Sequence, residues 1–305
     1  MKDFKNKILF ITGGASGAGL GQARVFAEAG CRIVLADLRP AALDEAVRII
    51  RGGHAEVHPI QLDVTDRGAF ARAADEVERV FGRAPDLLFN TAGVNTFGPI
   101  EKSTYEDFDW LLGVNLGGVV NGMQTFVPRM IAAGRGGHIV TTSSVGGFAG
   151  NQAAGIYSAA KAAVINLMES YRMSLEKYGI GVSVLCPANI KSNIAEATKT
   201  RPAHLANTGY VVNDDTIKSL HGIYSHGMDP VELAQHVKRG IQDNQLYIIP
   251  YPEVKEGLDA HFKAILAAVL PMDQDPEGAR KRTEALIAWQ KEREQLMRPS
   301  DSNTA

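Results

Sequence analysis

Residues Ile8–Gly21 read Ile-Leu-Phe-Ile-Thr-Gly-Gly-Ala-Ser-Gly-Ala-Gly-Leu-Gly, and this stretch decides the fold. The apolar run Ile8–Ile11 predicts a buried strand, glycines crowd the next residues, and a helical pattern covers 22–29. In this order a glycine turn favours a dinucleotide site, because it lets the backbone approach a pyrophosphate and the helix N-terminus offers free N–H groups. A tight turn without a ligand is the alternative. The candidate cofactor residues here are Gly13, Ser16, Gly17, Ala18 and Gly19.

Length and composition are those of an ordinary globular protein. The 305 residues are 45% hydrophobic and 22% charged, with a net charge of -2. This balance gives no electrostatic reason to expect nucleic acid or an anionic membrane as a partner. The basic start is too short for a signal peptide, and no apolar run reaches the length of a transmembrane helix. Cys31 and Cys186 form no Cys-x-x-Cys pair, so we expect free thiols in a cytoplasmic protein.

Apolar strands alternate with helical patterns along the chain. Strands are expected at 7–12, 32–36, 56–62, 86–90, 138–142, 182–186 and 246–249. Helices are expected at 22–29, 40–51, 66–81, 108–133, 157–178, from 230 onward, and 276–297. We expect Asp66 and Asp229 to cap two of these helices. The alternation predicts an α/β fold: a single-domain, doubly wound parallel sheet of about seven strands, Rossmann-like, with helices on both faces and a ligand crevice at the carboxyl ends of the strands.

We expect residues 1–305 to form one dinucleotide-binding catalytic domain, without linkers or repeats. A loop-rich insert at 189–228 is predicted to be a substrate-binding lid over the crevice. Residues 273–305 are expected to be a helical extension with a frayed end. The sequence leaves open whether that helix packs on a neighbouring subunit or is solvated.

Asp37 follows the second expected strand, where a carboxylate can accept both ribose hydroxyls of adenosine and repel a 2′-phosphate. This position predicts NAD rather than NADP. Arg39 is the counter-argument, because a guanidinium pairs well with phosphate. Taken alone, Asp37 would be a solvated loop residue or a helix cap.

Small and polar residues also end the third and fourth expected strands. They are Asp63, Val64, Asn90, Ala92 and Gly93. An aspartate there could bond the adenine amino group, and small residues would let a cofactor lie close. Turn chemistry is the alternative for each, because Asn, Asp and Gly end strands for conformational reasons.

The stretch Tyr157-Ser-Ala-Ala-Lys161 begins a helix and puts a phenol and an ammonium one turn apart on the same face. The ammonium is expected to lower the pKa of Tyr157, which would make it a general base for alcohol oxidation and a general acid for ketone reduction. Ser144, at the end of the fifth strand, could hold the substrate oxygen. The chain repeats the spacing at Tyr251 and Lys255, but without a comparable hydroxyl ahead of it, so Tyr251 is interpreted as structural or as part of the substrate rim.

Asn115 is a polar residue within an apolar helical stretch. It could be a surface amide, or it could bond the local backbone and bend the helix. The functional alternative is that it orders a water chain reaching Lys161.

Together these motifs resemble those of short-chain dehydrogenases/reductases over residues 5–250. The matching motifs are Thr12-Gly13-xxx-Gly17-Ala18-Gly19, Asp63, Asn90-Thr91-Ala92-Gly93, Asn115, Ser144, Tyr157-xxx-Lys161 and Pro187. The resemblance implies that Asn115, Ser144, Tyr157 and Lys161 are the catalytic tetrad. It also implies that the nicotinamide lies near Pro187 and Ile190, and that the helices after the fourth and fifth strands form a homodimer or homotetramer. Ala18, Thr91 and Ala188 depart from the common pattern by small changes that leave the chemistry intact.

Further stretches resemble the bacterial Cα-dehydrogenases of lignin β-aryl ether breakdown. They are the N-terminal block through Gly21, Gly93–Glu101, Pro187–Ala195 and Tyr247–Glu253. This likeness implies that NAD accepts a hydride from a benzylic secondary alcohol, as in guaiacylglycerol-β-guaiacyl ether, and that an aryl ketone forms. The same chemistry on another apolar alcohol, such as a steroid or cyclic diol, is one alternative. A non-catalytic NAD sensor is another.

The insert holds apolar residues that could pack on aromatic rings of a substrate or simply fold the insert onto the body. They are Ile190, Ile194, Tyr210, Val211, Ile223, Tyr224 and Met228, with Phe97 and Phe148 from strand ends. His204, His221 and His226 lie in the same insert without a metal-binding spacing, so no metal is expected.

Overall fold

The computed structural model describes residues 1–53, 55–211 and 214–296. The chain divides into two compact units, Met1–Val254 and Lys255–Ala305, and each is described by itself.

The first unit is built on one sheet of seven parallel strands in the order β3-β2-β1-β4-β5-β6-β7. The strands are β1 (Ile8–Thr12), β2 (Arg32–Asp37), β3 (Val57–Gln61), β4 (Leu87–Asn90), β5 (Gly137–Thr142), β6 (Ile180–Leu185) and β7 (Tyr247–Ile248). All seven lie where the sequence predicts them, and the doubly wound Rossmann-like sheet is confirmed. The strand order reverses beside β1, and ligand crevices form where an α/β sheet reverses direction.

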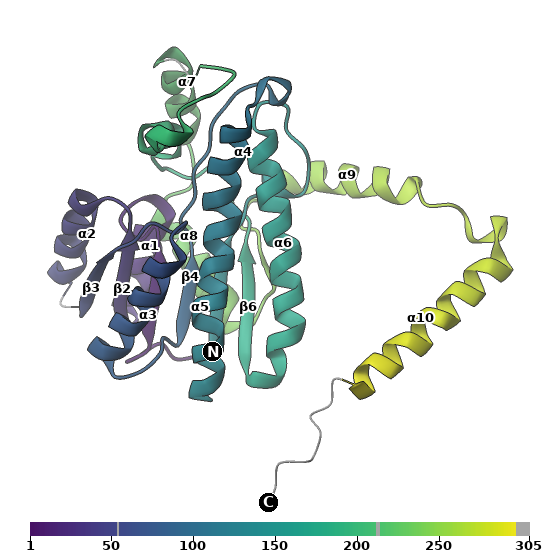
Figure 1. The fold of residues 1–305 in the computed structure, drawn as a ribbon, viewed down its shortest axis with the longest axis horizontal. Helices are drawn as coiled ribbons and strands as arrows, with labels where there is room; N and C mark the ends of the chain where they lie inside the picture. The colour runs from purple at the N-terminus through teal and green to yellow at the C-terminus, as the bar shows by residue number, and fades with distance from the viewer. Residues whose placement is uncertain (54, 212–213, 297–305) are drawn as a thin grey trace, which may run out of the picture. The chain divides into compact units, whose positions relative to one another are not determined.

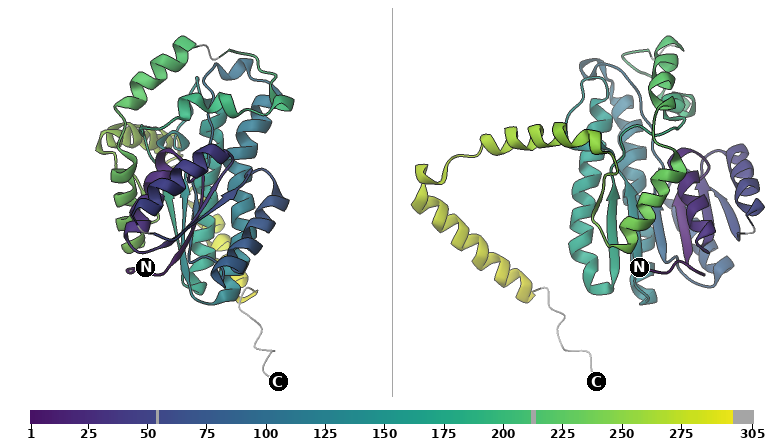
Figure 2. Two further views of the ribbon diagram at one scale, coloured as in Figure 1. Left: turned by 90° about the vertical axis from the view of Figure 1, so that its left-hand side faces the viewer. Right: turned by 180° about the vertical axis from the view of Figure 1, so that it is seen from behind.

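Helices cover both faces of this sheet (Figures 1 and 2). One face carries α1 (Gly17–Glu28), α2 (Pro40–Gly52) and α8 (Pro230–Gln242), and the other carries α3 (Arg67–Phe81), α5 (Gly118–Ala133) and α6 (Gly155–Leu175). Successive residues of β1 alternate between the two cores: Ile8 and Phe10 pack with α3, α5 and α6, and Leu9 and Ile11 pack with α1, α2 and α8. Both faces are therefore buried, as a parallel sheet requires.

Both predicted helix caps are confirmed. The Asp66 side chain accepts a hydrogen bond from the Ala69 N–H at 3.0 Å, and Asp229 accepts one from the Val231 N–H at 2.8 Å. The helix predicted over 108–133 begins earlier and is interrupted: α4 (Tyr105–Leu112) passes through a π-helical turn at Gly113–Gly117 into α5. That turn carries Asn115.

The insert at 189–228 has more secondary structure than predicted. It contains 3₁₀ turns at Ile194–Thr200 and Ala203–Leu205 and the helix α7 (Asp214–Ser225). Its two ends are held together, because the Lys191 N–H donates to the Met228 carbonyl at 3.1 Å and the Met228 N–H donates to the Asn189 carbonyl at 2.9 Å. Residues 212 and 213 of the predicted lid lie outside the described residues.

The described part of the second unit contains the helices α9 (Lys255–Ala267) and α10 (Pro276–Leu296), with a 3₁₀ turn at Met272–Gln274 between them. The sequence predicts α10 but not α9. Within 255–296, no side chain that the structure describes is buried. The predicted frayed end, residues 299–305, lies outside the described residues, as does the last residue of the helix predicted over 276–297. Over the described chain, none of the helices combines the length and apolarity needed to cross a bilayer.

Candidate active site

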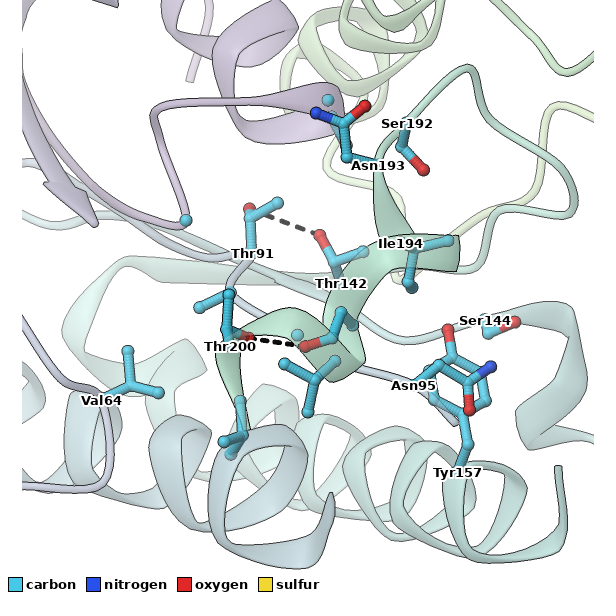
Figure 3. A pocket seen from close by; sticks show the side chains of 18 of the residues that line it. Val64, Thr91, Asn95, Thr142, Ser144, Tyr157, Ser192, Asn193, Ile194 and Thr200 are labelled. Carbon is cyan, nitrogen blue, oxygen red and sulfur yellow. Dashed lines mark hydrogen bonds between the residues drawn. The ribbon is translucent and has the colours of Figure 1, made fainter. Parts of the chain in front are cut away.

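A cavity of ≈ 910 Å³ opens at the carboxyl ends of the strands (Figure 3). That volume is in the range of small-molecule and cofactor sites. The predicted site residues that line it are Gly13, Ser16, Gly17, Ala18, Gly19, Asp37, Asp63, Val64, Ala92, Gly93, Ser144, Tyr157, Lys161, Pro187 and Ile190. Asn90 and Asn115 are not among its lining residues.

The glycine turn packs directly on the end of β4. Gly13 has φ +64°, and a Cβ there would lie 2.7 Å from the Ala92 Cα. A Cβ on Gly19 would lie 2.0 Å from the Gly13 carbonyl oxygen. Only glycine fits either position, and the turn brings the N-terminus of α1 to the cavity wall. No side chain caps that helix start, so it can accept an anion.

Asp37 is buried at the end of β2 and is part of a hydrogen-bonded group rather than a solvated loop. Its carboxylate accepts from the Ala15 N–H at 3.3 Å and from the Arg39 Nε at 3.1 Å. The Arg39 guanidinium donates in turn to the Ser16 hydroxyl at 2.8 Å. Arg39, whose guanidinium would favour the 2′-phosphate of NADP, is therefore hydrogen-bonded to the Asp37 carboxylate, which favours NAD.

The ends of β3 and β4 differ in what their side chains do. Asp63 lines the cavity, but its carboxylate also accepts from the Thr65 N–H at 2.9 Å, so the turn chemistry considered as an alternative is present. Asn90 is buried behind the cavity wall, where its amide donates to the Thr141 hydroxyl at 3.2 Å. A Cβ on Gly122 would lie 2.4 Å from the Asn90 Oδ1, so this side chain packs against α5.

Tyr157 and Lys161 both reach the cavity from the first turns of α6. The Lys161 Nζ lies 5.4 Å from the centroid of the Tyr157 ring and donates to the Thr142 carbonyl at 2.8 Å. The Ser144 hydroxyl accepts from the Gly146 N–H at 3.0 Å and donates to the Pro187 carbonyl at 3.4 Å, and it lines the cavity together with Tyr157. A phenol, a hydroxyl and a buried ammonium thus meet at one end of the cavity.

Burial dominates the titration of this pair. It raises the pKa of Tyr157 to about 12, although the neighbouring Ser144 side chain acts to lower that pKa. Burial also lowers the pKa of Lys161 to about 8. The sequence predicts that Lys161 lowers the pKa of Tyr157. In the protein without cofactor that pKa is raised instead, because desolvation of the phenolate outweighs the effect of neighbouring groups.

Asn115 is fully buried, so the surface-amide interpretation is wrong. Its amide donates to the carbonyls of Val94 at 2.9 Å and Leu111 at 3.0 Å, and its Oδ1 accepts from the Val94 N–H at 3.1 Å. The expected bond to the local backbone exists, at the π-helical turn. Asn115 also fixes the chain after β4: a Cβ on Gly93 would lie 2.9 Å from the Asn115 Oδ1 and 3.6 Å from the Lys161 Nζ.

The insert contributes Ile190, Ile194, His204 and Tyr224 to the lining of the cavity. Phe97, from the segment after β4, lines it as well. The other candidates are elsewhere: Tyr210 against Gly98, Met228 and Phe148 against the two main cores, and Val211 and Ile223 largely exposed. His221 lies 3.1 Å from Glu196, and His226 lies 2.9 Å from the Gly222 carbonyl. In the described part of the chain, no group of His, Cys, Asp and Glu could hold a metal.

A buried ion pair that the sequence analysis missed fastens the insert to α4. The Arg201 Nη1 lies 2.6 Å from the Asp107 Oδ1, with side-chain exposures of 10% and 0%. Burial opposes ionisation of Asp107, but hydrogen bonds from Thr104, Arg201 and Thr208 outweigh it and hold its pKa below the usual value. The only sequence signal is Thr104-x-x-Asp107, a capping box that marks the start of α4. Nothing in the sequence singles out Arg201.

Tyr251 is structural. It is 5% exposed, packs with the core of α1, α2 and α8, and donates from its hydroxyl to the Asn189 carbonyl at 3.1 Å. It does not line the cavity, so the two Tyr-xxx-Lys sequences of this chain have different environments.

Comparison with known proteins finds related dehydrogenases. The model of the family described as short chain dehydrogenase matches residues 7–203. The C alpha-dehydrogenase of Sphingobium sp. strain SYK-6 is 63% identical over 305 residues, 100% of both chains. The apo crystal structure of LigD from that strain is 57% identical with a TM-score of 0.76, covering 88% of this chain and 100% of that chain. A short chain dehydrogenase/reductase from Burkholderia phymatum, solved in complex with NAD, is 32% identical with a TM-score of 0.83, covering 89% of this chain and 98% of that chain.

The family match spans the glycine turn, Asn115, Ser144, Tyr157-xxx-Lys161 and the start of the insert, and the full-length relative extends the similarity to the second unit. The chain therefore belongs to the short-chain dehydrogenase/reductase family.

Proposed function

We propose that this chain is an NAD-dependent dehydrogenase that oxidises the benzylic secondary alcohol of a lignin-derived β-aryl ether, such as guaiacylglycerol-β-guaiacyl ether, to the aryl ketone. The observation that carries the chemistry is that the Tyr157 phenol lines one cavity with Ser144, Lys161 and the glycine turn. The substrate class is supported by the 63% identity, over its full length, to a C alpha-dehydrogenase.

The residues at the other end of the cavity fit a dinucleotide. The uncapped start of α1 suits a pyrophosphate, and the buried Asp37 carboxylate suits a ribose diol and disfavours a 2′-phosphate. Asp63, Val64, Ala92 and Gly93 would border the adenosine half, and Pro187 and Ile190 the nicotinamide half. The related Burkholderia phymatum structure contains NAD.

When bound, NAD supplies the hydride acceptor and, in its oxidised form, a positive charge near the phenol. Tyr157 removes the proton of the substrate hydroxyl as general base, and Ser144 holds the same oxygen by a hydrogen bond. Lys161, fixed by the Thr142 carbonyl, keeps a positive charge beside Tyr157 and positions the nicotinamide ribose. Asn115 holds Val94 and Gly93 next to Lys161 and supports the proton path.

The test measures the formation of reduced nicotinamide when the purified protein is incubated with each enantiomer of guaiacylglycerol-β-guaiacyl ether. NAD and NADP are assayed in parallel. We expect turnover with NAD, and at least about tenfold lower kcat/KM with NADP. Steroid and cyclic-diol alcohols are assayed beside it. If only the steroid or cyclic-diol alcohols are oxidised, the proposed substrate is wrong. If none of the alcohols is oxidised, the result favours a non-catalytic NAD sensor.

The proposal includes a cytoplasmic location and a homodimer or homotetramer. The free, buried thiols of Cys31 and Cys186 agree with a reducing compartment. The family resemblance supports an assembly through α5 and α6, the helices after β4 and β5. Light scattering coupled to size exclusion measures that assembly directly.

A further inference from the structure

The segment after β4 is rigidly held where it borders the catalytic residues. Asn115 binds both the N–H and the carbonyl of Val94, as described above. Further along, the Gly98 N–H donates to the Ala153 carbonyl at 2.9 Å, four residues before Tyr157. The chain between these two fixed points therefore has a defined position relative to α6.

Asn95 lies in this segment, and in the described structure only the oxygen of its side-chain amide has a hydrogen-bond partner. The side chain is 5% exposed and lines the cavity in the same region as Ser144 and Tyr157 (Figure 3). Its Oδ1 accepts from the Thr96 N–H at 2.9 Å. Since that N–H can only donate, this bond also determines which end of the amide is oxygen.

The Nδ2 of Asn95 consequently points away from the backbone bond, and no acceptor for it is found among the residues that the structure describes. Because Asn95 lines the cavity, an oxygen of a ligand there can accept a hydrogen bond from this Nδ2. Asn95 is thus a donor without a protein partner, held in place by its own oxygen.

Ser144 and Tyr157 already provide two hydroxyl groups for the oxygen that reacts. A third donor on the same wall suits a second acceptor oxygen close to the first. In the substrate proposed above, the carbon next to the reacting carbon carries the ether oxygen, which can only accept a hydrogen bond. Its chemistry therefore matches a group that can only donate.

We propose that Asn95 is a specificity-determining residue whose Nδ2 donates a hydrogen bond to the ether oxygen on the carbon adjacent to the oxidised carbinol. This inference rests on the proposed function and deepens it. It assigns recognition of the vicinal oxygen to Asn95, whereas Ser144 and Tyr157 act on the reacting oxygen itself.

The experiment compares two substrates with three proteins. The substrates are guaiacylglycerol-β-guaiacyl ether and its analogue with a CH₂ group in place of the ether oxygen. The proteins are the wild type, Asn95→Ala and Asn95→Asp, the last of which keeps the acceptor for the Thr96 N–H but loses the donor. Because one hydrogen bond is lost, we expect kcat/KM for the ether to fall about tenfold in both variants, mostly through KM, and kcat/KM for the CH₂ analogue to stay within about twofold of wild type.

Asn166→Ala is the control, since Asn166 lies on the same helix as Tyr157 and its amide donates to the Ala162 carbonyl at 3.5 Å at an exposed position. Asn166→Ala should leave kcat/KM unchanged for both substrates. An equal loss on both substrates in the Asn95 variants would show a structural role and overturn the inference. Equal kcat/KM of the wild type for the two substrates would also overturn it. If the wild type oxidises neither compound, the proposed function itself fails, and the inference fails with it.

Discussion

The two walls of the cavity are held in different ways. One wall carries Ser144, Tyr157 and Lys161 and is called the catalytic wall; the other, formed by residues of the insert 189–228, is called the insert wall. Buried hydrogen bonds join the catalytic wall to the sheet: the Lys161 Nζ donates to the Thr142 carbonyl at 2.8 Å, and the Ser143 hydroxyl donates to the Lys161 carbonyl at 2.7 Å. The insert wall is joined to the body at its two ends and by the ion pair between Arg201 and Asp107. Hydrogen bonds from Thr208 to Asp107 at 3.2 Å and from Asn207 to Glu106 at 3.1 Å join it further to the start of α4. In the proposed function, the strand and helix ends carry the chemistry and the insert shapes the substrate site.

Because the two walls have different roles in the proposed function, substitutions on them should have different kinetic effects. A change on the catalytic wall removes a reacting group while the cavity keeps its shape. A change at an anchor of the insert alters the shape while the reacting groups stay in place. The first should lower kcat and the second should raise KM.

The largest effect is expected for Tyr157→Phe. This variant removes the proton acceptor but keeps the ring, and loss of a general base typically lowers kcat by about 10²–10⁴-fold. Binding of NAD, measured by calorimetry or fluorescence, should stay within about twofold because the glycine turn and Asp37 are untouched. Full turnover by this variant would remove Tyr157 from the catalytic role.

The catalytic wall was also the more predictable one. Strand ends and the glycine turn have strong local signals, because only glycine fits at Gly13 and Gly19, and apolar runs such as Ile8–Ile11 must be buried. The caps at Asp66 and Asp229 are local as well, since each involves a side chain and an N–H two or three residues away.

The insert wall depends on contacts that the sequence does not reveal. Arg201 and Asp107 are far apart in the chain, and a lone arginine in a loop gives no sign of its partner. The sequence predicts a loop where α7 lies, and it places the start of the helix that includes α4 at residue 108 rather than 105, because the capping box at Thr104 precedes the apolar run. The Tyr157 pKa was predicted in the wrong direction for the chain alone, because burial cannot be read from motif spacing.

The next largest effect is expected for Arg201→Ala. It leaves the Asp107 carboxylate buried without its cation, and breaking a buried pair costs about 3–5 kcal/mol. Because Pro202, His204 and Leu205 line the cavity just after Arg201, we expect KM for the alcohol to rise about 30-fold while kcat changes less than about threefold. Lys218→Ala is the matched control, since its pair with Asp215 at 3.9 Å is exposed on the same insert and contributes little. A fall in kcat with unchanged KM would mean that the anchor serves the catalytic wall instead.

A smaller effect is expected for Asp37→Ala, which tests the cofactor end of the same cavity. The variant frees Arg39 from its carboxylate partner while Ser16 still accepts from the guanidinium. We expect the ratio of kcat/KM with NAD to kcat/KM with NADP to fall about tenfold, because a guanidinium near the ribose attracts a 2′-phosphate. The double variant Asp37→Ala/Arg39→Ala should lose NAD efficiency without gaining NADP. An unchanged ratio in the single variant would remove Asp37 from cofactor selection.

The smallest effect is expected for Tyr251→Phe, the same atomic change as Tyr157→Phe in the second Tyr-xxx-Lys sequence. The Tyr251 hydroxyl donates to the Asn189 carbonyl at 3.1 Å, and that carbonyl also accepts from the Met228 N–H at 2.9 Å. The carbonyl keeps one partner after the change, so we expect the free energy of unfolding to fall by only about 1 kcal/mol. Turnover should stay within about twofold, since Tyr251 does not line the cavity. A loss of turnover comparable to that of Tyr157→Phe would mean that the end of the insert, through Asn189, positions a reacting group, and the separation between the two walls would no longer hold.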